Sequence, residues 1–192
     1  MIRILHITDF HLNKRTLRDW NDSYKDSFFD KLKELQKERR IDLISFTGDL
    51  IDKGGKDFGG ASQAFTEFEK NIIYPILEFL ELEMSRFIIC PGNHDINRFA
   101  DDEIDEIGLK GTLTTSEKII TFIENTESKK SFKRIERIHE YKSFESKLYE
   151  NITDEKVHSI FKFSVKFKVG EKLIGVSSIN SSWRCFDNND YE

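Results

Sequence analysis

Short apolar segments alternate with helical patterns in the first half of the chain. Residues 2–8, 42–47 and 87–90 are apolar and rich in β-branched or aromatic side chains, as is typical of buried strands. Between them, residues 23–40 and 61–79 repeat apolar side chains at helical spacing. The order strand–helix–strand–helix–strand predicts a parallel, right-handed βαβαβ core and therefore an α/β fold.

The second half of the chain departs from this alternation. Residues 96–157 begin with an acidic stretch and then predict two helices, at about 114–125 and 131–150. We interpret this stretch as a helical insertion, which serves either as a lid or docking surface beside the site or only as a charged cover of the core. Residues 161–169 alternate apolar residues with lysine or serine, and with residues 173–176 they predict an antiparallel hairpin.

Composition bounds the class of protein. The 192 residues, 38% of them hydrophobic, fit a single domain, which we place at residues 1–192. The net charge of −5 provides no general attraction for nucleic acid or for an anionic membrane, although it leaves room for a local basic patch. The chain has two cysteines and no apolar run of about 20 residues, so neither a disulfide framework nor a membrane span is indicated. We expect a cytoplasmic protein.

Each of the three apolar runs ends in residues that ligate metals. Asp9 and His11 follow the first run, Asp49 follows the second, and Asn93 and His94 follow the third. Oxygen and imidazole ligands suit hard and borderline divalent metals. Because the carboxyl ends of neighbouring parallel strands meet at one edge of a sheet, these side chains are expected to converge there. The pattern predicts a dinuclear metal site built for hydrolysis.

These motifs resemble those of a known family. Three segments of this chain resemble the first three motifs of the calcineurin-like metallophosphoesterases. They are Asp9-Phe10-His11, Gly48-Asp49-Leu50-Ile51-Asp52 and Gly92-Asn93-His94-Asp95. The third motif with its preceding strand, and the later segment 178–183, are most similar to the bacterial cyclic-nucleotide phosphodiesterase-like branch. The resemblance implies a metallophosphoesterase sandwich that holds the βαβαβ core, the hairpin and the helical insertion.

The resemblance also implies a set of metal ligands. Asp9 and His11 would bind the first of two divalent ions, Asp49 would bridge both, and Asn93 would offer its carboxamide oxygen to the second. Manganese or iron is expected, with zinc as a further option. The two ions would clamp the phosphoryl oxygens and activate a water molecule for attack on phosphorus.

The resemblance assigns catalytic work to two further residues. His94 would act on the phosphoryl oxygen or the leaving group, and Asp52 would orient this histidine. Asp52 could instead only begin the glycine-rich turn that follows it. Asp95 is open to two interpretations, as a further ligand or as a residue that caps a turn or a helix.

The family pattern includes later histidines that this chain does not match. After His94 only His139 and His158 occur, and neither lies in a matching context, so no ligand role is transferred to them. We expect the 192 residues to be the N-terminal portion of a longer chain that carries the remaining ligands. The alternative is a degenerate member that binds a partner without catalysis.

Three functions are compatible with these observations. The first is metal-dependent hydrolysis of phosphodiesters, namely cyclic nucleotides or similar small diesters. The second is a nuclease of the same superfamily, favoured by Lys14, Arg15, Arg18 and the lysines of the hairpin and disfavoured by the acidic net charge. The third is an interaction module that docks a partner through residues 96–157. A phosphate-ester substrate and further domains of a longer chain are the expected partners, and no membrane partner is expected.

Overall fold

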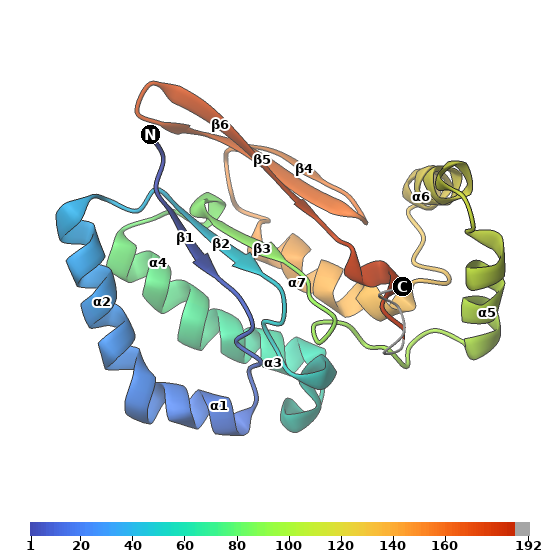
Figure 1. Cartoon of the computed structure of the whole chain (residues 1–192), viewed down its shortest axis with the longest axis horizontal. Helices are drawn as coiled ribbons and strands as arrows, with labels where there is room; N and C mark the ends of the chain where they lie inside the picture. Colours follow the sequence, from blue (N-terminus) through green and yellow to red (C-terminus); the bar gives the residue numbers. More distant parts are fainter. Residues whose placement is uncertain (187–192) are drawn as a thin grey trace.

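Three short strands form a parallel sheet in the computed structural model, which describes residues 1–186. They are β1 (Ile4–Ile7), β2 (Leu43–Thr47) and β3 (Phe87–Cys90), in the spatial order β1-β2-β3 (Figure 1). The middle strand, β2, is mostly buried, as expected for a strand covered on both faces. The parallel core predicted from the three apolar runs is confirmed.

Helices connect the strands of this sheet and pack against it. They are α1 (Lys14–Asp19), α2 (Lys25–Glu38), α3 (Ala61–Phe68) and α4 (Tyr74–Leu80). A π-helical turn joins α1 to α2 and another, Glu69–Ile73, joins α3 to α4. Pro75 lies in the first turn of α4, a position where proline is tolerated. The π turn Glu69–Ile73 runs directly into α4, so the predicted helical face continues through this residue.

The second sheet is antiparallel. It contains β4 (Glu155–His158), β5 (Lys162–Val169) and β6 (Lys172–Ile179), in the order β4-β5-β6. The predicted hairpin is confirmed as β5 and β6, with the lysines of β5 exposed and its apolar side chains buried. β4 was not predicted, because all four of its residues are exposed and show no apolar alternation. In Figure 1 the parallel sheet lies between this sheet and helices α2 to α4.

Helix α7 (His139–Leu148) belongs to the main hydrophobic core, together with side chains from both sheets. Phe144 stacks on Phe65 of α3 with 4.6 Å between ring centroids, and Tyr149 stacks on Phe163 of β5 at 4.0 Å. Helix α7 is shorter than the helix predicted at 131–150. It begins at residue 139 because the preceding residues form turns and a short 3₁₀ helix, Glu136–Ile138.

Helices α5 (Glu103–Thr112) and α6 (Ser116–Lys129) stand apart from the two sheets (Figure 1). Only α6 was predicted, in part. The signals for α5 were Asp102, whose side chain caps the helix by accepting from the Ile104 N–H, and an acidic first turn. A second, smaller cluster of buried side chains lies in this region: Ile96, Ile135, Ile138, Ile160, Phe161 and Trp183.

A buried ionic cluster attaches α5 to the rest of the molecule. The guanidinium of Arg137 is fully buried and donates to the carboxylates of Asp101 and Glu106. Asp101 also accepts from the backbone N–H groups of Glu136 and Arg137. Removing one partner of such a buried pair leaves an uncompensated charge, so the cluster fixes the segment between β3 and α5.

In the described part of the chain, none of the helices combines the length and the apolar character that crossing a bilayer requires.

Candidate metal centre

The loops after β1 and β2 run side by side beyond the sheet. The N–H of Asp9 donates to the Gly48 carbonyl at 3.1 Å, and the N–H of His11 donates to the Asp49 carbonyl at 2.8 Å. The N–H of Leu12 continues the pattern with the Leu50 carbonyl at 3.0 Å. These backbone bonds extend the parallel pairing past the strand ends. The first two sequence motifs are therefore held in a fixed register.

Three of the predicted site residues have an unusual backbone conformation. The φ angles of Asp9, His11 and Asp49 are 56°, 49° and 53°, in the left-handed region that side chains other than glycine seldom occupy. Such strain costs on the order of 1–3 kcal/mol per residue and concentrates at functional sites. The carboxylates of Asp9 and Asp49 both approach Nε2 of His11, at 3.8 and 3.7 Å.

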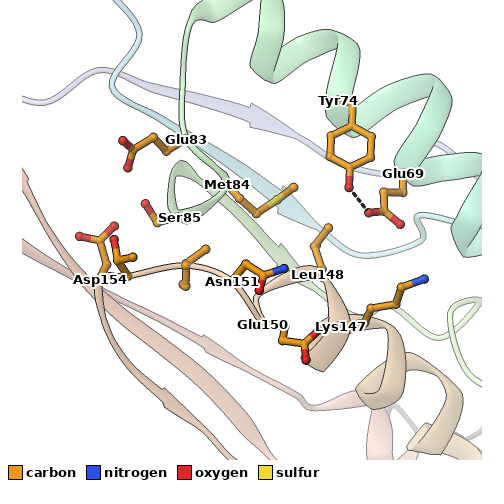
Figure 2. Close-up of a pocket in the computed structure, with 12 residues that line it drawn as sticks. Glu69, Tyr74, Glu83, Met84, Ser85, Lys147, Leu148, Glu150, Asn151 and Asp154 are labelled. Carbon is orange, nitrogen blue, oxygen red and sulfur yellow. Dashed lines mark hydrogen bonds between the residues drawn. The ribbon is translucent and has the colours of Figure 1, made fainter.

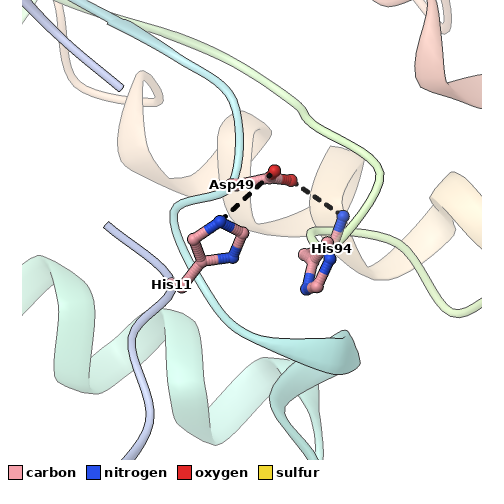
Figure 3. A group of neighbouring side chains, drawn as sticks. All are labelled: His11, Asp49 and His94. Carbon is pink, nitrogen blue, oxygen red and sulfur yellow. Dashed lines mark hydrogen bonds and ion pairs between the residues drawn. The ribbon is translucent and has the colours of Figure 1, made fainter. Parts of the chain in front are cut away.

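A carboxylate lies between two histidines at this point, as Figure 3 shows. One oxygen of Asp49 lies 3.7 Å from Nε2 of His11, and the other accepts the backbone N–H of His94 at 2.9 Å. Potential ligand atoms of His11, Asp49 and His94 all lie within 4.8 Å of one another. Two imidazoles and a carboxylate are a ligand set suited to zinc, manganese or iron. The donor chemistry of the site fits a divalent metal.

The structure places the other two predicted ligands less closely. A carboxylate oxygen of Asp9 lies 3.8 Å from Nε2 of His11, on the same side as Asp49. Its second oxygen accepts a hydrogen bond from the Thr8 hydroxyl at 2.6 Å. Asn93 is half-buried beside His94 and lines a cavity there, but in the described part of the chain its carboxamide has no hydrogen bond to His11, Asp49 or His94. The structure thus brings Asp9, His11 and Asp49 together. Asn93 is near them only because it precedes His94 in the chain.

The His94 imidazole contacts the carboxylate of Asp52. Nδ1 of His94 lies 2.9 Å from a carboxylate oxygen of Asp52, and the Gly54 N–H donates to the His94 carbonyl at 2.9 Å. Asp52 begins the glycine-rich turn, yet its side chain makes no capping bond there. With Nδ1 directed at Asp52, Nε2 remains for a metal or a substrate. The ring lies edge-on to the His11 ring, with 4.6 Å between centroids.

Gly92 is required where the third motif approaches the second. A Cβ at this position would lie 2.2 Å from Oδ1 of Asp49 and 2.5 Å from its backbone nitrogen. No side-chain carbon tolerates such distances, so a larger residue would displace the central carboxylate. The glycine of the third motif therefore serves the geometry of Asp49.

Asp95 links the loops that follow β2 and β3. Its carboxylate is fully buried and accepts the Ile51 N–H at 2.9 Å and the Gly92 N–H at 2.8 Å. Burial raises the pKa of Asp95 to about 8, against the opposing effect of these two hydrogen bonds. Both oxygens are occupied by backbone amides, which agrees with the interpretation as a turn-capping residue. The sequence indicated a turn, but it could not show which amides the carboxylate satisfies.

Other charged residues near the motifs lie outside this cluster. Arg15 and Arg18 are exposed on α1 and pair with Asp19, at 3.6 and 3.9 Å. Lys14 begins the same helix and is also exposed. These three basic residues therefore lie on a solvent-exposed surface of α1. His158, for which no ligand role was expected, pairs with Glu145 at 2.8 Å.

A separate cavity of about 520 Å³ lies between the start of α4 and the segment that follows α7 (Figure 2). Tyr74 donates to Glu69 at 2.5 Å, and Glu83, Glu150 and Asp154 add further carboxylates to its lining. None of the predicted metal-ligand or catalytic residues lines it. The cavity is therefore not part of the candidate metal centre.

The parallel sheet, the antiparallel sheet and the strand-end cluster define a metallophosphoesterase fold. A family model described as calcineurin-like phosphoesterase matches residues 2–177, and the chain belongs to this family. Among curated proteins, an uncharacterized metallophosphoesterase-like protein, YydB of Bacillus subtilis (strain 168), is 28% identical over 100 residues. The match covers 50% of this chain and 18% of that relative, so the chain spans only a small part of the relative's length. Membership of the family supports a metal-dependent phosphoesterase in general.

Proposed function

We propose that this chain is the N-terminal part of an enzyme that hydrolyses phosphodiester bonds, in cyclic nucleotides or similar small diesters, by means of a metal-activated water, and that the later histidine ligands missing here are needed for full activity. The observation that supports this proposal most strongly is the position of the Asp49 carboxylate. It lies 3.7 Å from His11 and accepts the backbone N–H of His94 at 2.9 Å, with Asp9 close by. A carboxylate in this place can share its two oxygens between two cations.

Each predicted ligand has a place in this proposal. Asp9 and His11 would hold a first divalent ion, Asp49 would be shared with a second, and Asn93 would offer its carboxamide oxygen to the second. Manganese or iron is the preferred metal, and zinc is compatible with the same ligands. When bound, the ions supply a water nucleophile at neutral pH and positive charge next to the phosphoryl oxygens.

His94 and Asp52 handle the proton in this scheme. Nδ1 of His94 lies 2.9 Å from a carboxylate oxygen of Asp52. In this scheme Nδ1 carries a proton toward that carboxylate, which leaves Nε2 toward the reacting group. A protonated Nε2 can donate to the phosphoryl oxygen or to the departing alkoxide oxygen. The negative charge of Asp52 stabilises the imidazolium that this role requires.

We further propose that residues 1–192 form the N-terminal portion of a metallophosphoesterase domain, with a helical insertion at about residues 96–157. Helices α5 and α6 and their own small cluster of buried side chains are consistent with an inserted unit. Helix α7 packs into the main core, which makes it the part of this stretch that joins the insertion to the domain. Further domains of a longer chain remain part of the proposal.

The proposal is tested with the full-length, manganese-loaded protein and bis(4-nitrophenyl) phosphate as a generic diester. We expect release of 4-nitrophenolate that falls to background in Asp49→Asn. The carboxamide has no negative charge and only one oxygen, so it cannot replace a carboxylate shared by two cations. Asp57→Asn is the matched control, since Asp57 is an exposed carboxylate of the glycine-rich segment away from the cluster. No turnover by the manganese-saturated protein, or full turnover by Asp49→Asn, would contradict the proposal.

A further inference from the structure

A cavity of about 740 Å³ adjoins the candidate metal centre, because His94 and Asn93 form part of its wall. Small-molecule sites commonly enclose roughly 300–1,000 Å³. This is far more room than a phosphoryl group needs. A phosphate ester held at the metal centre would therefore have space for one of its organic substituents in this cavity.

The lining of the cavity combines apolar groups with an exposed aromatic ring. Ala61 and Ile96 contribute buried apolar side chains, with 1% and 3% of their surface exposed. Phe99 also lines the cavity, yet 96% of its surface is exposed. A phenylalanine that leaves both ring faces in water contributes nothing to the core. Such a ring beside a polar site is a ready partner for another planar group.

The segment that carries Phe99 is held in place by its own hydrogen bonds. The N–H of Asn97 donates to the Arg137 carbonyl at 3.0 Å, and the Asn97 side chain accepts the Phe99 N–H at 3.2 Å. Two residues further on, Asp101 is anchored in the buried cluster with Arg137. The exposure of Phe99 therefore results from an anchored turn.

The charge around the cavity favours an anionic ligand. Among the lining residues that the structure describes, Lys53 and Lys56 are exposed cations and Glu140 supplies a carboxylate. An excess of positive charge at the mouth of a cleft raises the local concentration of anions. A phosphate ester meets this condition.

Building on the proposed function, we propose that this cavity binds an aromatic ring in the organic part of the phosphate ester, with Phe99 as the stacking partner of that ring. Phe99 is then a residue that determines specificity. It selects among esters by their substituent, whereas the metal centre binds the phosphoryl group that all of them share.

The test compares two non-hydrolysable probes, phenylphosphonate and methylphosphonate, by isothermal titration calorimetry with manganese-saturated protein. Methylphosphonate reports on the metal centre alone, and the ratio of the two affinities reports on the cavity. We expect phenylphosphonate to bind about three- to tenfold more tightly, the range of an aromatic pair. Phe99→Ala should abolish this preference without changing methylphosphonate binding, and Phe99→Tyr should retain it.

Tyr24→Ala is the matched control, because Tyr24 is an exposed aromatic residue that does not line the cavity. It should leave the preference unchanged. Equal affinity of the unmodified protein for both probes, or an undiminished preference in Phe99→Ala, overturns the inference while the proposed function stands. If neither probe binds, the proposed function fails and this inference fails with it.

Discussion

At the scale of single residues, the site depends on side chains whose backbone is strained and whose neighbours are small. Asp9, His11 and Asp49 all have positive φ angles. Their identity and order could be predicted from sequence, because each follows an apolar strand. Their strain could not, since it depends on hydrogen bonds between two loops that are 38 or 39 residues apart in the chain, such as Asp9 N–H to the Gly48 carbonyl.

One prediction at this scale concerns the residue that orients His94. Asp52→Asn keeps the shape of the side chain but removes the charge that stabilises an imidazolium. We expect kcat for bis(4-nitrophenyl) phosphate to fall by about 10²-fold or more, with unchanged affinity for manganese. Steady-state kinetics and a manganese titration separate the two effects. An unchanged kcat, or a parallel loss of metal binding, would show that Asp52 has a different role.

A second residue-scale prediction concerns Gly92. Gly92→Ala places a methyl group against Asp49, within 2.5 Å of its backbone nitrogen, so the carboxylate must move. We expect manganese affinity to fall by about 10- to 100-fold, as for other changes that misplace a ligand. Gly111→Ala is the matched control, because a Cβ there meets nothing within 4 Å. Equal manganese affinity in the two variants would contradict this view of Gly92.

At the scale of elements, apolar runs were the reliable signal and exposed elements were missed. The three parallel strands and the β5–β6 hairpin could be predicted because burial imposes a recognisable pattern on their residues. β4 and α5 could not be recognised from hydrophobicity, since β4 is exposed and α5 buries only Glu106 and Leu109 among the residues of the helix. The start of α7 was placed too early, because Phe132 and Ile135 continue the helical spacing although Ile135 packs in the second cluster.

A prediction for the elements concerns the contact between α7 and the sheet. The hydroxyl of Tyr149 donates to the Phe87 carbonyl at 2.7 Å and accepts the Ile89 N–H at 3.0 Å. Since β3 is at one edge of the parallel sheet, this hydroxyl satisfies backbone groups that the sheet leaves open. Tyr149→Phe leaves the Phe87 carbonyl and the Ile89 N–H without this hydrogen-bond partner in the core.

We expect this substitution to lower the free energy of unfolding by about 1–3 kcal/mol, measured by urea denaturation followed by circular dichroism. Tyr24→Phe removes the same hydroxyl from an exposed tyrosine and should change it by less than about 0.5 kcal/mol. Equal stability of the two variants would mean that the hydroxyl of Tyr149 does not support β3.

At the scale of the whole molecule, one core joins the two sheets and a smaller one supports α5 and α6. The main core runs from the helices through both sheets to α7, and it fixes the strand ends that carry the motifs. The smaller cluster and the Arg137 cluster fix the segment that carries Phe99. The cavity beside the metal centre thus lies where these two units meet, at residues 93–99.

The most direct test of the central claim is a crystal structure of the protein with manganese, with the metal located by anomalous scattering. We expect a manganese ion bound by Asp9, His11 and Asp49, and a second that shares Asp49 and contacts Asn93. The same peaks should be absent from crystals of Asp49→Asn. Manganese bound elsewhere, or no peak beside Asp49 at a saturating concentration, would contradict the account.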